Sequence, residues 1–328
     1  MAKVIGLGNA LVDIMTSLET DQILKDINFP KGSMQLVDAE KSKEILDLTA
    51  DLKSSLASGG SAANTIHGIA RLGMECAFVG TTGQDEYGDI FKQDLIKSHI
   101  TPKLFESESE TGRAVAMVSP DSERTFATYL GAAVDLSAKH ITPELFKGYD
   151  MLHIEGYLVF NEDLIETAVK TAKEAGLEVS LDLASFNVVE AKLEFLQRIS
   201  KEYVDIIFAN EEEAKSFTGE EDPEKALKVI GDYAKVSIVK IGKQGSMILK
   251  DGEITRVGII EATALDTTGA GDLYAAGFLF AYLNNHGLEK AGKIGALLAG
   301  KVIEEMGAQI KDSVWNDILA QVKSIISA

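Results

Sequence analysis

Asp266-Thr-Thr-Gly-Ala-Gly-Asp272, followed by the apolar run Leu273–Tyr282, is the stretch from which the fold and chemistry of this chain are interpreted. It predicts a helix that begins near Gly269-Ala270-Gly271. Backbone N–H groups at a helix N-terminus are unpaired and attract anions, and these small residues leave them accessible. A carboxylate beside a bound phosphate is suited to accept a proton from an attacking hydroxyl, so Asp272 is a candidate general base.

Ordinary helix capping explains the same stretch equally well. Thr267 or Thr268 would then be the N-cap, and Asp272 would be an acidic residue in the first turn. The chain contains no GxxxxGK[ST] phosphate loop, and Gly6-Leu-Gly8-Asn9-Ala10-Leu11 lacks the third glycine of a dinucleotide-binding loop. The sequence therefore contains no phosphate-cradling loop of the first kind and gives little support for the second.

The composition is that of a globular protein that does not bind nucleic acid. The chain has 328 residues, of which 45% are hydrophobic, and its net charge is 32 − 51 = −19. Such a charge disfavours nucleic acid and anionic membranes as partners. Cys76 is the single cysteine, no apolar run approaches 18 residues, and residues 1–14 do not match a secretory signal. We expect a cytoplasmic protein without an intramolecular disulfide.

Strand-length apolar runs alternate with helical patterns along the whole chain. The predicted strands are Val4–Leu7, Ala77–Val79, Met151–Ile154, Val179–Leu183, Asp205–Ala209, Val236–Ile241 and Ser246–Lys250. The predicted helices are Asp38–Leu52, Ser61–Leu72, Glu86–Ser98, Asn161–Ala175, Glu211–Phe217, Glu224–Tyr233, Gly269–Asn284, Leu288–Met306 and Ser313–Ile326. This alternation predicts one α/β domain over residues 1–328, with a mainly parallel sheet and helices on both faces.

Two regions interrupt this alternation. Thr16–Val37 has no clean period, and Thr111–Leu130 alternates around the turn Pro120-Asp-Ser-Glu123 as a hairpin does. We interpret them as a small antiparallel lid formed by approximately residues 14–37 and 104–131. The alternative is that the two regions are surface segments with no shared function.

Polar residues near the N-terminus are candidates for binding a sugar. In Ser58-Gly59-Gly60-Ser61-Ala-Ala-Asn64, the glycines allow close approach of a ligand, Ser61 is a plausible N-cap, and Asn64 offers a donor and an acceptor. Asn9 and Asp13 follow the first strand, where α/β sheets bind ligands, and a carboxylate there can accept two hydrogen bonds from a diol. A capped loop and a turn residue remain the simpler explanations.

Two further segments follow predicted strands. Asn210-Glu-Glu-Glu213 suits a helix start, and Glu213 is a candidate to reach magnesium or its waters. Lys240-Ile-Gly242-Lys-Gln-Gly245 suits a tight turn or a loop over a nucleotide. A solvated helix face and a simple turn are the alternatives.

Taken together and in order, these segments resemble the ribokinase-like (PfkB) family of carbohydrate and nucleoside kinases. Gly59–Asn64 resembles the N-terminal glycine motif of the family, Asp266–Asp272 its C-terminal motif, and Asn210 and Glu213 its N-x-x-E element. The resemblance implies a three-layer ribokinase-like sandwich with a β-sheet lid. It also implies an enzyme that uses ATP and Mg²⁺.

The resemblance implies a role for each matching residue. Asp272 would be the general base, and the N–H groups of Gly269, Ala270 and Gly271 would hold the transferred phosphoryl group. Asn210 and Glu213 would organise magnesium, and ATP would be bordered by Lys240, Gly242, Gly245 and Thr267. The acceptor would be held by Asn9, Asp13, Gly59, Gly60 and Asn64. Family members often bind potassium near this site, and Asp266 and Thr268 match part of that ligand set.

Within the family, the pattern is most similar to adenosine kinases. Phe186, in Leu183-Ala-Ser-Phe-Asn187, resembles an aromatic residue that lies against the purine, and Arg124 resembles a lid arginine that reaches the site. We therefore expect phosphorylation of the primary hydroxyl of a nucleoside, with adenosine first. A sugar kinase for ribose, fructose or a related carbohydrate is the alternative, and a catalytically silent binding module ranks below both. Monomer and homodimer both remain open.

Overall fold

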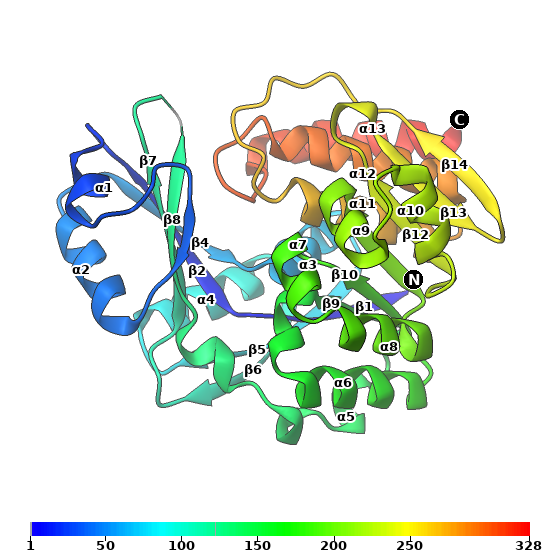
Figure 1. Ribbon diagram of the computed structural model, residues 1–328, viewed down its shortest axis with the longest axis horizontal. Helices are drawn as coiled ribbons and strands as arrows, with labels where there is room; N and C mark the ends of the chain where they lie inside the picture. Colours follow the sequence, from blue (N-terminus) through cyan, green and yellow to red (C-terminus); the bar gives the residue numbers. More distant parts are fainter. Residues whose placement is uncertain (1, 122) are drawn as a thin grey trace.

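The protein is described by a computed structural model that covers residues 2–121 and 123–328. Within these residues, nine strands form one sheet in the order β14-β13-β12-β11-β10-β9-β1-β5-β6 (Figure 1). Neighbours from β12 to β6 are parallel, whereas β13 and β14 extend one edge in antiparallel fashion. The predicted mainly parallel sheet is confirmed, although β6 and β14 were not expected.

Several strands of this large sheet are longer than predicted. The nine strands are β1 Lys3–Leu7, β5 Glu75–Gly83, β6 Ile100–Ser107, β9 Met151–Glu155, β10 Glu178–Asp182, β11 Ile206–Asn210, β12 Val236–Lys240, β13 Ser246–Lys250 and β14 Glu253–Val257. The parallel strands β9, β10, β11 and β12 end in Glu155, Asp182, Asn210 and Lys240. Because parallel strands end on the same side of a sheet, these four polar residues are brought together.

Helices form a layer on each face of the sheet, as predicted. One layer contains α3 Ser61–Arg71, α4 Glu86–Lys97, α11 Ala270–Leu283, α12 Leu288–Val302 and α13 Trp315–Ser327. The other contains α5 Pro143–Phe146, α6 Glu162–Glu174, α7 Phe186–Ala191, α8 Leu193–Tyr203, α9 Glu211–Thr218 and α10 Pro223–Ile230. Short 3₁₀ turns cover Gly131–Asp135, Ala138–His140, Gly156–Phe160, Gly242–Gln244 and Asp312–Val314.

The alternation of side chains along the strands separates the two apolar layers. Val4 and Phe78 pack into the cluster of α3 and α11, whereas their neighbours Ile5 and Val79 pack into the cluster of α6 and α8. Successive strand residues point to opposite faces, so a fully apolar strand is buried on both sides. No helix in the described part of the chain is both long and apolar enough to cross a membrane.

A second sheet stands beside the large one, with strands in the order β3-β8-β7-β2-β4 (Figure 1). Its strands are β2 Leu11–Ser17, β3 Met34–Leu36, β4 Ser54–Gly59, β7 Gly112–Val118 and β8 Arg124–Tyr129. Helix α1 Gln22–Asp26 connects β2 to β3, and α2 Ala39–Thr49 connects β3 to β4. The hairpin of β7 and β8 is antiparallel as predicted, but β2 and β7 are parallel.

The predicted extent of the lid differs from this sheet in three places. β2 begins at Leu11 rather than at residue 14, and β4 supplies an edge strand that the sequence did not reveal. Residues 104–107 belong to β6 and therefore to the large sheet. β4 escaped notice because Ser54–Gly59 is poor in the β-branched and aromatic residues that mark a strand.

Helices α11 and α12 approach each other closely at two glycines. A Cβ atom on Gly277 would lie 2.5 Å from the carbonyl oxygen of Ile294, and one on Gly295 would lie 2.8 Å from the carbonyl oxygen of Tyr274. Backbone cannot yield as a flexible side chain does, so only glycine fits at this crossing. The position of α11, and with it that of Asp272, depends on this contact.

We predict that Gly277→Ala lowers the free energy of unfolding by about 1–3 kcal/mol, because overpacking outweighs the better helix propensity of alanine. Gly258→Ala is the matched control, since a Cβ atom there meets nothing within 4 Å. Urea unfolding of both variants measures the difference. Equal stabilities would contradict the close packing of these helices.

Candidate active site

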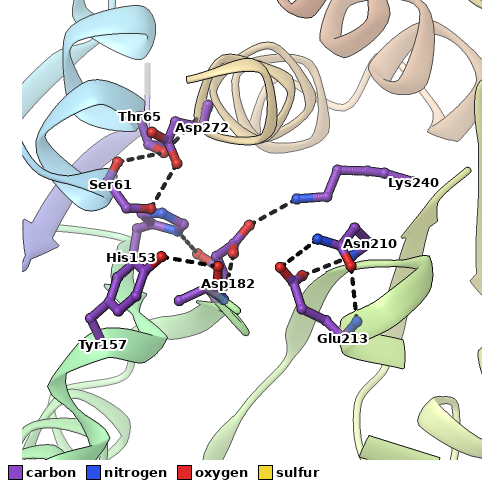
Figure 2. Close-up of polar contacts among 11 residues, drawn as sticks. Ser61, Thr65, His153, Tyr157, Asp182, Asn210, Glu213, Lys240 and Asp272 are labelled. Carbon is purple, nitrogen blue, oxygen red and sulfur yellow. Dashed lines mark hydrogen bonds and ion pairs between the residues drawn. The ribbon is translucent and has the colours of Figure 1, made fainter. Parts of the chain in front are cut away.

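A cleft of about 1020 Å³ lies at the carboxyl ends of the parallel strands. Asp182, Asn210 and Lys240 line it from the large sheet, Asp13 from the second sheet and Asp272 from the start of α11. Figure 2 shows the central polar groups, with Asp272 beside Ser61 and with Lys240 pointing toward Asp182. The cleft therefore collects carboxyl and amide groups from both sheets and from the start of α11, together with the ammonium group of Lys240.

Helix α11 begins without a side-chain cap. Gly269 is the N-cap in a left-handed conformation (φ 75°), so the predicted threonine cap is wrong, whereas Asp272 does lie in the first turn. The N–H of Ala270 donates to the carbonyl of Thr267 at 3.2 Å, while those of Gly269 and Gly271 have no acceptor among the described residues. The start of α11 thus offers two of the three N–H groups expected for an anion.

Asp272 is held from two directions by α3. Its carboxylate accepts hydrogen bonds from Ser61 Oγ at 2.7 Å and from Asn64 Nδ2 at 2.9 Å, and its carbonyl accepts one from Thr65 Oγ1 at 3.1 Å. Burial raises the pKa of Asp272 to about 6, against the opposing effect of the two hydrogen bonds. The carboxylate is therefore ionised and oriented at neutral pH.

Ser61 differs from its predicted role. Gly60 is the N-cap of α3, with φ 98°, and Ser61 is the first helical residue, so its hydroxyl is available to Asp272. Gly60 lacks space for a side chain because a Cβ atom would collide with the carbonyl oxygen of Asn9. The Gly-Gly pair thus brings α3 against the first strand and directs Ser61 into the cleft.

Gly59 lies beside Asp13 rather than in the lining of the cleft. It pairs with Leu11 in the second sheet, and a Cβ atom there would overlap the Asp13 carboxylate. Burial raises the pKa of Asp13 to about 7, and the charges of Asp272 and Asp266 add to this rise. The carboxylate forms no hydrogen bond with another described residue, so its oxygens face the cleft as acceptors.

Asn9 is buried behind the cleft and does not line it, in contrast to the expectation that it binds the acceptor. Its backbone N–H and its Nδ2 donate to Glu155 at 3.0 and 2.6 Å, and Ala62 N–H donates to the other carboxylate oxygen at 2.9 Å. Burial raises the pKa of Glu155 to about 7 in spite of these donors. Glu155, which the sequence analysis missed, thereby fixes the loop after β1 and the start of α3.

Asn210 and Glu213 form a reciprocal cap at the start of α9. Asn210 Oδ1 accepts from Glu213 N–H at 2.9 Å, while Glu213 accepts from Asn210 N–H at 2.8 Å and from Asn210 Nδ2 at 2.6 Å. Glu213 is 3% exposed, and burial, followed by the charge of Asp182, raises its pKa to about 7. Both residues line the cleft, so the cap also presents carboxylate oxygens to it.

Lys240 is the cation at the centre of the cleft. Its Nζ lies 3.1 Å from Asp182 Oδ2, and a Cβ atom on Gly271 would lie 3.0 Å from the same nitrogen. Burial opposes its charge, but Asp182 and Glu213 outweigh this and raise the pKa of Lys240. Asp182 was not predicted, although its place at the end of a parallel strand is the one signal that could have found it.

The remaining nucleotide-loop candidates also line the cleft. Gly242 and Gly245 lie after β12 with φ of 51° and 93°, and Thr267 lies before α11. A Cβ atom on Gly245 would collide with the carbonyl oxygen of Val257, so this turn requires glycine. The loop after β12 therefore lines the cleft next to Lys240.

Phe186 and Arg124 are not among the cleft-lining residues. Phe186 is the first residue of α7 and 39% of its surface is exposed. Arg124 instead forms an ion pair with Asp266 and donates to Thr268 Oγ1 at 2.9 Å. The aromatic residues that do line the cleft are Phe126, from the second sheet, Tyr157, and Tyr274 of α11.

Comparison with known proteins identifies the family of this chain. The model of the pfkB family of carbohydrate kinases matches residues 35–315, and the chain belongs to this family. The protein is accordingly a kinase with the ribokinase-like fold.

Two solved structures and one curated relative illustrate the similarity. A probable sugar kinase from Rhizobium etli CFN 42 is 33% identical, with a TM-score of 0.88 and 99% of each chain covered. Adenosine kinase from Sinorhizobium meliloti is 32% identical, with a TM-score of 0.87 and with 98% of this chain and 99% of that chain covered. A nucleoside kinase from Methanocaldococcus jannaschii is 30% identical, with 81% of this chain and 85% of the relative covered.

We predict that Asp13→Asn is stabilised relative to wild type, and that this stabilisation is larger at pH 8 than at pH 5 by about 1–2 kcal/mol. The folded-state pKa of about 7 lies above the ordinary value of 3.8, so the folded chain retains a proton that the unfolded chain loses. Wild-type stability therefore falls as pH rises from about 4 to 7, and the amide removes this contribution. Urea unfolding at both pH values measures it.

The exposed Asp47→Asn serves as the control for this pH dependence. A variant at Asp13 that is no more stable than wild type at pH 8 would show that the Asp13 carboxylate is well solvated.

Proposed function

We propose that the protein transfers the γ-phosphoryl group of ATP to the primary hydroxyl of a nucleoside, with adenosine as the first candidate. The observation that carries this proposal is the Asp272 carboxylate, which is fixed by Ser61 and Asn64 beside the uncapped start of α11. A base and an anion site so close together suit the attack of an alcohol on phosphorus.

Asp272 would act as the general base. Its pKa of about 6 leaves it ionised at neutral pH and near the value at which a base both accepts and releases a proton readily. The two hydrogen bonds from α3 fix the orientation of the Asp272 carboxylate. Its side chain would therefore not need to change rotamer before it accepts a proton from the substrate hydroxyl. The proton would move from that hydroxyl to the carboxylate as the new O–P bond forms.

The developing charge on the phosphoryl group would be met by backbone and by Lys240. The N–H groups of Gly269 and Gly271 have no acceptor among the described residues, and Lys240 Nζ lies next to Gly271. Preorganised donors and a buried cation stabilise charge more strongly here than in water. Asn210, Gly242, Gly245 and Thr267 border the same end of the cleft, where ATP would lie.

Magnesium fits the site through its water shell. The oxygens of Asn210 and Glu213 line the cleft, but no group of three or more His, Cys, Asp or Glu side chains in the described residues could hold a metal directly. Mg²⁺ usually retains several waters and binds one or two carboxylates together with substrate phosphates. When bound, it would neutralise phosphate charge, and Asn210 and Glu213 would position its waters.

The acceptor would be held between Asp13 and Asn64. Asn64 donates to Asp272 through Nδ2, while its Oδ1 is buried without a partner among the described residues. Together with the open Asp13 carboxylate, it supplies acceptors for a pair of sugar hydroxyls. Phe126 and Tyr157 add aromatic surface that suits a base. This aromatic surface, and the likeness to a protein named adenosine kinase, favour a nucleoside.

We predict that Asp272→Asn lowers kcat by about 10²–10⁴-fold while the affinity for ATP stays nearly unchanged. The amide removes the base but keeps the shape of the side chain. Coupled ADP-release kinetics and titration with a fluorescent ATP analogue measure the two quantities. Asp163→Asn, an exposed first-turn aspartate of α6, is the matched control. Turnover near the wild-type rate in Asp272→Asn would remove Asp272 from its role.

We predict that adenosine supports faster ADP release than ribose or fructose, because only a nucleoside reaches the aromatic side chains of the cleft. The assay compares adenosine, inosine, ribose and fructose at equal concentrations, with substrate-free enzyme as the control. Turnover confined to the sugars would favour the alternative, a sugar kinase, which the likeness to a probable sugar kinase supports. Nucleotide binding without product for any of the four would indicate a binding module.

A further inference from the structure

Arg124 extends from the second sheet to the loop that leads into α11. It is the first residue of β8, and its guanidinium forms an ion pair with Asp266 and donates from Nη1 to Thr268 Oγ1 at 2.9 Å. The side chains of Arg124 and Asp266 are 11% and 0% exposed. A contact so thoroughly removed from water is sensitive to the loss of either partner.

Both oxygens of the Asp266 carboxylate have partners. Its Oδ1 accepts from Thr268 N–H at 2.6 Å, and its Oδ2 accepts from Gly307 N–H at 2.6 Å in addition to the ion pair. Burial opposes the charge, but Arg124 and these N–H donors keep the pKa of Asp266 below its ordinary value. The carboxylate is therefore an anion that joins the loop before α11, the segment after α12 and the second sheet.

Potassium, which the resemblance implied for Asp266 and Thr268, does not fit this arrangement. A monovalent cation needs oxygens with free lone pairs directed at it, whereas here the Thr268 hydroxyl accepts from Arg124 and both Asp266 oxygens accept from donors. A potassium ion at this carboxylate would also lie in contact with a guanidinium of the same charge. The positive charge at this position is supplied by the chain itself.

We propose that Arg124 is a built-in cation that replaces a monovalent metal ion beside the phosphoryl-binding loop, so that this kinase does not depend on potassium. The guanidinium neutralises Asp266 and holds Thr268 directly before Gly269, the residue at which α11 begins. The inference concerns the site of the proposed reaction, but its test does not require turnover.

The position of Arg124 links this charge to the second sheet. Phe126 lies two residues further along β8 on the same face, and it lines the cleft. One face of β8 therefore supplies both the cation for Asp266 and an aromatic side chain for the cleft. A displacement of this sheet would leave Asp266 without its counter-ion.

The test is the thermal unfolding of wild type and Arg124→Ala in potassium chloride and in choline chloride at equal ionic strength. We expect the same Tm for wild type in both salts. Arg124→Ala should lose about 5–10 °C in choline chloride, because a buried charge is left unpaired. It should then regain stability as potassium increases, because an ion that binds only the folded state stabilises it.

Three variants control this result. Arg124→Lys retains a charge and should not respond to potassium, and Arg256→Ala, which removes an exposed arginine paired with Glu224, should not respond either. The double variant Arg124→Ala/Asp266→Asn removes both charges, so it should unfold at a higher temperature than Arg124→Ala and be indifferent to potassium.

Two outcomes would overturn the proposal. One is a wild-type Tm that rises in potassium as much as that of Arg124→Ala. The other is an Arg124→Ala protein that folds but shows no response to potassium. These unfolding measurements involve no substrate. A failure of the nucleoside assignment would therefore not change their result, and a failure of the potassium proposal would not change the nucleoside assignment.

Discussion

The hydrogen bonds from Ser61 and Asn64 to the Asp272 carboxylate join the starts of two helices that are far apart in the sequence. α11 is almost entirely apolar and buried, so one charged group at its first turn must be stabilised by polar groups from elsewhere. α3 supplies them because the Gly-Gly turn before it permits a close approach to the first strand. The orientation of the carboxylate, and its ionisation near neutral pH, both follow from this junction.

Sequence reasoning succeeded where geometry demands a particular residue type. The parallel sheet followed from apolar strands alternating with helices. The resemblance had implied one site for Asn210 and Lys240, and both line the cleft because each ends a parallel strand of the same sheet. The anion-binding start of α11 was one of two equal interpretations of the run of small residues, and the absence of a side-chain cap favours it. These inferences depend on local pattern, on the resemblance of motifs and on the topology of parallel sheets.

It failed where a side chain's partner lies far away in the chain. Asn9 follows a strand, as a ligand-binding residue would, but its side chain donates a hydrogen bond to Glu155 instead. No local motif marks Glu155. Arg124 and Thr268 meet across 144 positions, and neither sequence neighbourhood indicates the other. Phe186 was predicted to lie against the purine, but the aromatic residue that lines the cleft from the second sheet is Phe126. A single sequence contains no record of such pairings.

The residues that line the cleft come from two parts of the chain. Asp13 and Phe126 belong to the second sheet, within the first 130 residues, whereas Asp182, Lys240 and Asp272 come from the later part. The two parts remain coupled, because Ser61 and Asn64 bind Asp272 and Arg124 pairs with Asp266 across them. Chimaeras exchanged near residue 130 would keep each of these two clusters intact.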